Sequence, residues 1–420
     1  MHLPLFLHHA SALLGEVFRW NGPVDATVSQ YGRQHSKLGA RDRALLGDAV
    51  YNVLRHRTHM EALAKTGPGE RTERLVLLGA GEAANAWAEA MSPDQRAWWQ
   101  AARAPISSDL PEDQRLNLPP WLIARLKSQG MTELQALADA WNQVASVDLR
   151  VNVQQAKRDK LIVQMQAQDW AVEATPYSPW GLRMAQRRPL TATPWYQSGA
   201  IEVQDEGSQL LAALVGAKRG EMVADFCAGA GGKTLAMGAM MRNQGRLYAL
   251  DTSAHRLEAI KPRLQRAGLS CVYTTAMSDE HDHRLQGLFQ KMARVLVDAP
   301  CSGLGTLRRS PDIKWRVTES ELAALAQQQR SILASAARLV QPGGRLVYAT
   351  CSVLREENED IAQDFTAHHA DFVPLAAEQA LSPTIKDESM RESLSSEGYL
   401  RLWPHIHNTD GFFAAVWQRR

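Results

Sequence analysis

The chain has 420 residues, in which 47 lysines and arginines oppose 45 aspartates and glutamates. This length predicts two or three domains, and a content of 45% hydrophobic and 22% charged residues excludes a disordered or fibrous chain. The net charge of +2 excludes a polycationic binder, so any contact with a nucleic acid must come from local basic patches. Four cysteines are too few for a disulfide framework, which indicates a reducing, cytoplasmic compartment.

Residues 1–140 are predicted to be helical throughout. Stretches such as Asp42–Leu54 and Thr132–Val144 place apolar residues at helical spacing. The amino-terminal segment is apolar but has no basic residue at its start, which favours an amphipathic helix over a cleaved signal peptide. No apolar run is long enough to span a bilayer, so a soluble protein without membrane contact is expected.

A change of pattern near residue 145 predicts a small α+β domain, of ferredoxin-like or RRM-like type, over residues 145–204. A helix is expected at Lys157–Gln168. The extended segments expected around this helix are Val147–Val153, Trp170–Ala174, Leu182–Met184 and Ile201–Val203.

Residues 205–420 are predicted to form an α/β domain. Strands are expected at Met222–Phe226, Leu247–Leu250, Arg294–Val297 and Arg345–Ala349, with helices that begin at Thr234, end at Ala267 and follow the capping box Thr318–Glu321. Pro342-Gly343-Gly344 is expected to end the last helix. This alternation predicts a doubly wound parallel sheet, in which ligands bind beyond the carboxyl ends of the strands.

A glycine-rich turn, Cys227–Lys233, follows the first of these strands. A phosphate-binding loop requires glycine where Cys227 stands, and a dinucleotide fingerprint requires glycine where Thr234 stands, so neither motif is complete. Asp251 ends the second strand 20 residues after Gly231, where a carboxylate can accept hydrogen bonds from both hydroxyls of a ribose. The pattern favours a nucleoside-type cofactor, with a purely structural turn as the alternative.

Two further cysteines stand at strand ends. Cys301 follows Asp298-Ala-Pro and Cys351 follows Thr350, so both thiols are expected over the same edge of the sheet. A thiol of lowered pKa is a suitable nucleophile for an electron-poor ring carbon. Cys271 is interpreted as a small buried hydrophobe. The sequence contains no Cys-x-x-Cys pair, and no metal site is expected.

Four motifs together make the sequence similar to a known family. They are Asp298-Ala-Pro-Cys-Ser-Gly303, Tyr348-Ala-Thr-Cys-Ser352, Gln204-Asp-Glu-Gly-Ser-Gln209 and Thr409-Asp-Gly-Phe-Phe413. With them, residues 145–420 resemble the Nop/Sun family of RNA cytosine-5 methyltransferases, in particular its bacterial RsmB-type members, which methylate 16S ribosomal RNA. Within residues 1–140, Gly39–Arg43 and Ala49–Arg55 resemble the NusB-like RNA-binding domain of that subgroup.

The resemblance implies a class I methyltransferase sheet of Rossmann-like type, S-adenosylmethionine as cofactor and 5-methylcytidine in 16S rRNA as product. It also implies that Cys351 adds to C6 of the cytosine, and that Cys301 helps to remove the C5 proton and to release the enzyme. Asp298 is expected at the cytosine edge and Lys233 near cofactor and base. The residues expected at the cofactor are Cys227, Ala228, Gly229, Ala230, Gly231, Gly232, Lys233, Asp251, Asp279 and Asp298.

The chain departs from the family pattern at two positions. Gly229-Ala230 replaces the usual Ala-Pro of the turn, a change that loosens the turn but leaves room for the cofactor. The acid that usually follows the third strand, near the adenine, aligns with Met277, and Asp279 is expected to take its place.

Two basic clusters are expected to contact RNA. The first follows Cys301 and combines Arg308, Arg309 and Lys314 with Trp315, which suits phosphate contact and base stacking; a solvated loop is the alternative. The second lies in the helical region and consists of Arg33, Lys37, Arg41, Arg43, Arg55 and Arg57, with only Asp42 and Asp48 opposing.

The expected function is an S-adenosylmethionine-dependent RNA cytosine-5 methyltransferase that acts as a monomer on 16S rRNA or a small-subunit particle. The main alternative is a noncatalytic RNA-binding assembly factor on the same scaffold, which would need neither Cys301 nor Cys351. A nucleotide hydrolase built on Gly232-Lys233-Thr234 would lack the first glycine of its loop. Only the family resemblance favours RNA over DNA.

Overall fold

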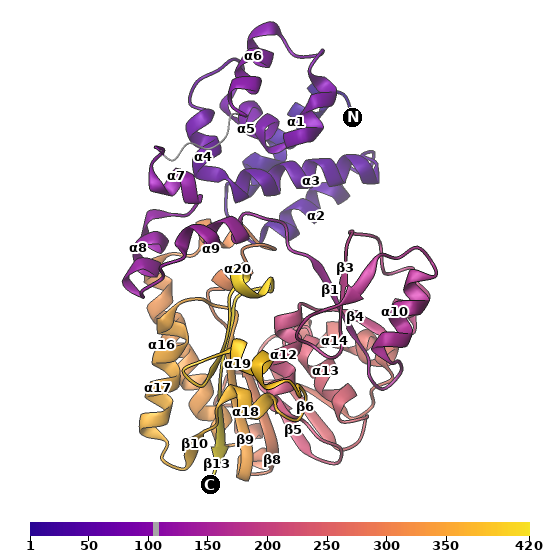
Figure 1. Ribbon diagram of the computed structural model, residues 1–420, viewed down its shortest axis with the longest axis vertical. Helices are drawn as coiled ribbons and strands as arrows, with labels where there is room; N and C mark the ends of the chain where they lie inside the picture. The colour runs from indigo at the N-terminus through magenta and orange to yellow at the C-terminus, as the bar shows by residue number, and fades with distance from the viewer. Residues whose placement is uncertain (104–108) are drawn as a thin grey trace. The chain divides into compact units, whose positions relative to one another are not determined.

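The computed structural model of the chain describes residues 1–103 and 109–420 (Figure 1). The chain divides into two compact units, one of residues Met1–Val144 with Thr306–Thr318, the other of residues Ala145–Gly305 with Glu319–Arg420. The domains predicted for residues 145–204 and 205–420 therefore lie within a single unit. Over the described residues, every helix is too short or too polar to cross a membrane.

The first unit is built from helices, as predicted. They are α1 (Leu3–Val17), α2 (Val24–Gln34), α3 (Ala40–Arg55), α4 (Arg57–Leu63), α5 (Arg71–Gly79), α6 (Pro93–Ala101), α7 (Glu112–Leu116), α8 (Pro120–Ser128), α9 (Leu134–Trp141) and α15 (Ile313–Arg316), with a 3-10 turn η1 at Gly81–Trp87. The amino-terminal helix α1 is amphipathic, because Phe6, Leu13 and Leu14 are buried in a core shared with Val50 and Leu54 of α3.

The segment Thr306–Thr318 belongs to this helical unit although it follows the Cys301 motif in sequence. The Lys314 ammonium donates hydrogen bonds to the Arg55 carbonyl (2.8 Å) and to Asn142 Oδ1 (3.2 Å). Lys314 is 1% exposed and Arg308 is 4% exposed. The expectation that these two residues contact RNA is therefore not supported, because their charged groups are buried inside a protein unit rather than presented on a loop.

The half-buried histidine His56 predicts that the stability of this unit depends on pH. Burial, followed by the charges of Lys314 and Arg55, lowers the pKa of His56 from 6.5 to about 4. Between these values the unfolded chain binds more protons than the folded one, so stability is complete above about pH 6.5 and is lost as the pH falls towards 4. We expect the free energy of unfolding, measured by urea titration, to rise by ~1–3 kcal/mol as the pH increases across this window. The rise should be smaller in His56→Gln. An equal pH dependence in the variant would contradict this assignment.

The second unit begins with a small antiparallel sheet. Its strands are β1 (Val147–Val151), β2 (Val172–Ala174), β3 (Gly181–Met184) and β4 (Ile201–Val203), in the order β2-β3-β1-β4, with α10 (Arg158–Gln166) between β1 and β2 and α11 (Pro194–Gln197) before β4. This order, with a crossover helix between β1 and β2, is that of a ferredoxin-like sheet and confirms the predicted α+β fold.

A nine-stranded sheet forms the centre of the second unit, in the order β11-β12-β13-β9-β8-β5-β6-β7, with β10 paired to β13. Strands β5 to β9 are parallel to one another, whereas β13 is antiparallel to β9. Figure 1 shows α16 and α17 on one side of this sheet and α12 to α14 on the other. The doubly wound Rossmann-like fold predicted from the sequence is thus confirmed.

The elements of this domain have the following bounds. The strands are β5 (Met222–Asp225), β6 (Arg246–Asp251), β7 (Val272–Ala276), β8 (Met292–Asp298), β9 (Val340–Thr350), β10 (Phe372–Pro374), β11 (Ser395–Ser396), β12 (Tyr399–Leu402) and β13 (Phe412–Arg419). The helices are α12 (Glu206–Val215), α13 (Gly232–Met240), α14 (Ala254–Ala267), α16 (Glu319–Ala337), α17 (Glu359–His368), α18 (Ala377–Leu381), α19 (Glu388–Ser393) and α20 (Pro404–His407), and 3-10 turns lie at His283–Leu288, Leu304–Thr306 and Arg355–Glu357.

One predicted boundary is wrong. The Pro342–Gly344 stretch was expected to end a helix and precede a strand, but α16 already ends at Ala337 and β9 begins at Val340. The stretch lies inside β9 as an irregularity, where the register with β8 shifts between Met292 and Arg294. A Cβ atom at Gly344 would lie 2.9 Å from the Met292 carbonyl oxygen, so glycine permits this close approach.

The motif Gln204–Gln209 joins the two sheets of the second unit. The buried Glu206 carboxylate accepts hydrogen bonds from the backbone amides of Tyr177 (2.6 Å) and Ser178 (2.7 Å). Gln209 Nε2 donates to the Leu149 carbonyl of β1 (3.3 Å), and Asp205 Oδ2 accepts from the Asp410 amide (3.2 Å). The motif therefore holds the ferredoxin-like sheet, α12 and the segment before β13 together.

Candidate active site

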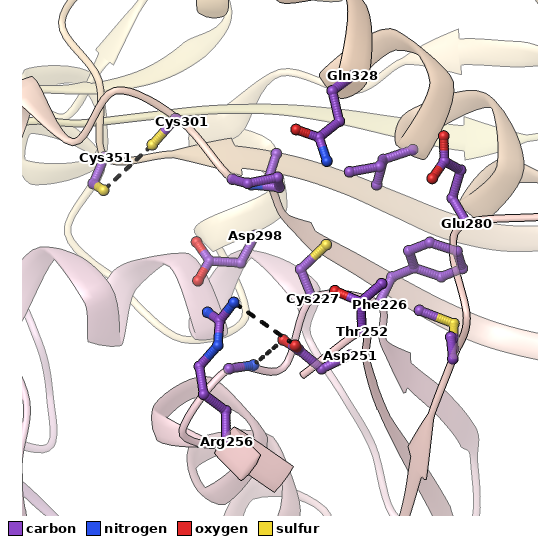
Figure 2. Close-up of a pocket in the computed structure, with 15 residues that line it drawn as sticks. Phe226, Cys227, Asp251, Thr252, Arg256, Glu280, Asp298, Cys301, Gln328 and Cys351 are labelled. Atoms are coloured by element: carbon purple, nitrogen blue, oxygen red, sulfur yellow. Dashed lines mark hydrogen bonds and ion pairs between the residues drawn. The ribbon is translucent and has the colours of Figure 1, made fainter. Parts of the chain in front are cut away.

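A cavity of about 370 Å³ opens at the carboxyl ends of the parallel strands (Figure 2). Its walls come from the ends of β5 to β9 and from α16. The lining residues are Phe226, Cys227, Gly229, Asp251, Thr252, Arg256, Met277, Glu280, Asp298, Ala299, Pro300, Cys301, Gln328, Ile332 and Cys351. A cavity of this volume at this edge of a doubly wound sheet can hold a nucleoside-sized ligand.

The glycine-rich turn forms one wall of the cavity. Gly231 has a φ of +83° and precedes the first residue of α13, and a Cβ atom there would lie 2.9 Å from Ile260. The turn brings the Gly229 amide within 2.8 Å of Asp251 Oδ2, while Asp251 Oδ1 accepts from the Ser253 amide at 2.7 Å. A carboxylate has about four acceptor directions, so both oxygens can accept a further hydrogen bond from a ligand in the cavity.

An ion pair lies deeper in the site. The Lys233 ammonium at the start of α13 donates to Asp298 Oδ2 at 2.7 Å. Burial opposes the charge of Lys233, but the Asp298 carboxylate outweighs it and leaves the pKa of Lys233 above its ordinary value. Burial also raises the pKa of the nearby Asp225 to about 7, although Asp225 accepts a hydrogen bond from the Thr234 hydroxyl. Lys233 is thus a fixed cation beside the cavity.

The two predicted strand-end thiols meet at one end of the cavity. Cys301 Sγ and Cys351 Sγ are 3.4 Å apart, and both cysteines are free. The hydrogen bond that Cys301 donates to Cys351, together with burial, raises the pKa of Cys301 well above its ordinary value. Figure 2 shows this pair at the far side of Asp298 from Glu280 and Gln328. Two free thiols therefore lie together in the lining of this cavity.

Close backbone packing fixes the loops that carry these thiols. The Gly305 amide donates to the Cys351 carbonyl at 2.8 Å, and the Gly411 amide donates to the Gly305 carbonyl at 2.8 Å. A Cβ atom at Gly305 would lie 2.0 Å from the Gly411 carbonyl oxygen, so only glycine fits. The motif Thr409–Phe413 thus packs directly against both cysteine loops.

Most of the predicted cofactor residues line the cavity or adjoin it, but Asp279 does not. Its carboxylate accepts a hydrogen bond from the His281 amide at 2.7 Å and is not part of the lining. Glu280 lines the cavity instead, and its carboxylate accepts from the Ser331 hydroxyl of α16 at 2.5 Å. Asp279 was chosen as the acid nearest to Met277, with which the family's acid aligns, and such an alignment does not tell which side chain of an irregular loop turns inward.

Sequence reasoning also missed Thr252, Arg256 and Gln328. Gln328 lies on α16, far along the chain from the turn, and is itself exposed, so helical periodicity does not distinguish it from the other exposed residues of this helix. The other cofactor candidates lie in the turn itself without being part of the lining; they are Ala228, Ala230, Gly231, Gly232 and Lys233. Cys271 is buried at 5% exposure, as predicted.

The basic residues of the helical unit divide into two groups. Arg33, Lys37, Arg41 and Arg43 are exposed on α2, α3 and the segment between them. Arg55 is buried, and the guanidinium of Arg57 lies over the rings of Phe18, Trp20 and Trp315. Arg309 is half-buried. Within residues 1–103 and 109–420, no group of three or more histidine, cysteine, aspartate or glutamate residues is arranged to hold a metal ion.

The fold and the site together define a class of protein. Parallel strands β7-β6-β5-β8-β9 flanked by an antiparallel β13, with a glycine-rich turn after β5 and a carboxylate at the end of β6, are typical of class I methyltransferases. Comparison with known proteins narrows this class. Residues 212–418 match the family described as 16S rRNA methyltransferase RsmB/F, and residues 118–191 match the ferredoxin-like domain described for RsmF/B-like methyltransferases. The chain belongs to the RsmB/F family of 16S rRNA methyltransferases.

Individual relatives agree with this assignment. The chain is 35% identical to a probable ribosomal RNA small subunit methyltransferase B from Bacillus subtilis, over 65% of this chain and 59% of that protein. It is 33% identical to a protein of the same name from Synechocystis, over 72% of this chain and 67% of the relative. The crystal structure of PH0851, at 25% identity, gives a TM-score of 0.76 and covers 98% of this chain and 97% of that chain. The sequence matches thus span about six to seven tenths of the two named relatives.

Proposed function

We propose that the protein is an S-adenosylmethionine-dependent methyltransferase that forms 5-methylcytidine in small-subunit ribosomal RNA. The observation that carries this proposal is the pair of free thiols, Cys301 and Cys351, held 3.4 Å apart at the end of a nucleoside-sized cavity. A noncatalytic assembly factor would gain nothing from two such thiols. The names of the relatives support ribosomal RNA as the substrate.

The residues around the cavity fit S-adenosylmethionine. The Asp251 carboxylate can accept hydrogen bonds from the ribose hydroxyls, and Phe226, Met277 and Ile332 contribute apolar lining that suits a purine ring. The carboxylate of Glu280 and the amide of Gln328 stand at the end of the cavity away from the two thiols (Figure 2) and can pair with the adenine edge. When bound there, the cofactor supplies an electrophilic methyl group on its sulfonium.

The protein's own groups supply the remaining chemistry. Cys351, as thiolate, forms a bond to C6 of the cytosine and thereby moves an electron pair to C5, which becomes nucleophilic. After methyl transfer, loss of the C5 proton restores the double bond between C5 and C6 and expels the Cys351 thiolate. Cys301 takes this proton after it has released its own proton to solvent water. That release becomes easier once Cys351 is bonded to carbon, because Cys351 then no longer carries the negative charge that raises the pKa of Cys301.

The surfaces that contact RNA form part of the proposal. Arg41 and Arg43 are exposed on α3, near the exposed Arg33 and Lys37, and can position phosphates. Arg309 remains a candidate from the first cluster. Charge reversal of both Arg41 and Arg43 would be expected to weaken RNA binding without altering cofactor affinity.

Transfer of labelled methyl from S-adenosylmethionine to unmethylated 16S rRNA, followed by digestion to nucleosides, tests the function directly. Label in 5-methylcytidine is the expected result. If neither the free RNA nor 30S particles acquire label, the assembly-factor alternative gains and the proposal fails for this substrate.

The cofactor site predicts a contrast between neighbouring acids. Asp251→Asn and Glu280→Gln are each expected to weaken S-adenosylhomocysteine binding about 10- to 100-fold, because each loses a charge-assisted hydrogen bond to the ligand. Asp279→Asn is the matched control and should bind with wild-type affinity, since its side chain does not line the cavity. Isothermal titration calorimetry measures all three. If only Asp279→Asn weakened binding, Asp279 rather than Glu280 would be the acid that contacts the adenine.

A further inference from the structure

A buried carboxylate lies behind the two thiols. Glu357 is 0% exposed and ends the 3-10 turn Arg355–Glu357. Its Oε1 accepts hydrogen bonds from the Ser302 amide (2.8 Å) and from Gln329 Nε2 (3.1 Å). Its Oε2 accepts from the Ser302 hydroxyl (2.6 Å) and from the Ser352 hydroxyl. Four donors therefore converge on one carboxylate that is closed to solvent.

The donors of this network tie together the two loops that carry the thiols. Ser302 directly follows Cys301, and Ser352 directly follows Cys351. The two serine hydroxyls are themselves 3.2 Å apart. Gln329 of α16 completes the network, because its amide also donates to the Pro300 carbonyl at 2.9 Å. One carboxylate thus bridges the loop after β8, the loop after β9 and the helix between them.

The backbone around Glu357 is held as firmly as its side chain. The Tyr348 hydroxyl donates to the Glu357 carbonyl at 2.6 Å. The neighbouring Asn358 accepts from the Thr350 hydroxyl (2.5 Å) and donates to the Ser352 carbonyl (3.0 Å). These contacts fix the backbone that carries the Glu357 carboxylate. The carboxylate can therefore act as a fixed anchor for the two cysteine loops.

Burying a carboxylate is costly unless all its acceptor positions are used, and a well-packed apolar group would often be at least as stable. We propose that Glu357 is a positioning residue, a clip that fixes the spacing of the Cys301 and Cys351 thiols so that both act on one base. Glu357 does not line the cavity and touches no reacting atom, so it acts through Ser302 and Ser352. This inference rests on the proposed function for its consequence in catalysis, but the clip itself can be tested without RNA.

The charge of the clip has a second effect, which separates the two thiols. Besides the hydrogen bond that Cys301 donates to Cys351 and burial, the negative charge of Glu357 raises the pKa of Cys301. Cys301 is thereby kept protonated in the free enzyme, while Cys351 is left to act as the nucleophile. A neutral group at position 357 would remove this contribution to the raised pKa of Cys301.

The first test is the pH profile of iodoacetamide alkylation at Cys301, followed by mass spectrometry on the full chain without RNA. Glu357→Gln can fold in place, because the serine hydroxyls can reverse and accept from its amide nitrogen. We expect its Cys301 profile to move to lower pH, with alkylation at pH 8 about tenfold faster than in the wild type. Asp360→Asn, the same carboxylate-to-amide change at a half-buried residue that pairs with Arg355, is the control and should keep the wild-type profile.

The second test separates the clip from its charge. Ser302→Ala combined with Ser352→Ala keeps the Glu357 carboxylate but removes its hydroxyl links to both loops. We expect kcat for methyl transfer to fall about 100-fold, as small misplacements of reacting groups do, with unchanged affinity for S-adenosylhomocysteine and unchanged KM for RNA. Wild-type kcat in this double variant, or a wild-type Cys301 profile in Glu357→Gln, would overturn the proposal. Failure of the proposed function itself would show differently, as an absence of methyl transfer by the wild-type protein.

Discussion

Cys351→Ala is expected to abolish methyl transfer while leaving cofactor affinity unchanged. Without the thiolate no bond forms to C6 of the cytosine, and C5 remains too poor in electrons to accept a methyl group. We expect the rate to fall by at least about 10³-fold, the scale typical of a lost covalent nucleophile. Cofactor affinity should persist because Cys351 lies at the end of the cavity away from Glu280 and Gln328 (Figure 2).

Two measurements check this expectation. Single-turnover transfer of labelled methyl gives the loss of rate, and calorimetric titration with S-adenosylhomocysteine gives the affinity. Cys271→Ala is the matched control, because this thiol is buried and lies outside the cavity lining. A Cys351→Ala variant that still methylates at a substantial fraction of the wild-type rate would show that Cys351 is not the nucleophile.

The arrangement of the sheet could be predicted because its signals are local. Hydrophobic strands ending at Asp251 and Asp298, and the glycine-rich turn before α13, each follow from a short stretch of sequence. Parallel strands bring their carboxyl ends to one edge, so the meeting of Cys301 and Cys351 followed from topology alone. The boundary at Val340 was missed because the Pro-Gly-Gly stretch signals a break in either a helix or a strand.

The parts that could not be predicted depend on contacts between distant residues. The basic run around Lys314 has the composition of an RNA-binding loop. The Lys314 ammonium instead donates hydrogen bonds to the Arg55 carbonyl and the Asn142 side chain inside the helical unit. Charge and spacing do not reveal such acceptors. Glu357 was likewise indistinguishable from the acids beside it, because its burial follows from the two serines that reach it from separate loops.

Cys301→Ala should have the opposite signature from Cys351→Ala. Addition of Cys351 and methyl transfer do not require the second thiol, so the covalent protein–RNA adduct should still form. Its resolution requires a base for the C5 proton, and without that base the Cys351 thiolate is not expelled. We therefore expect the adduct to accumulate in the presence of S-adenosylmethionine as a gel shift that resists denaturant, while turnover falls by about 10²–10⁴-fold.

The adduct assay also decides between the two assignments of the thiols. The double variant Cys301→Ala with Cys351→Ala should give no adduct, which shows that Cys351 supplies the bond. An adduct in Cys351→Ala, and none in Cys301→Ala, would exchange the two roles. Such an exchange would conflict with the chemistry of the site, because the hydrogen bond that Cys301 donates to Cys351 and the negative charge of Glu357 both favour the protonated form of Cys301. A thiol held in that form is a poor nucleophile for the first attack on the ring.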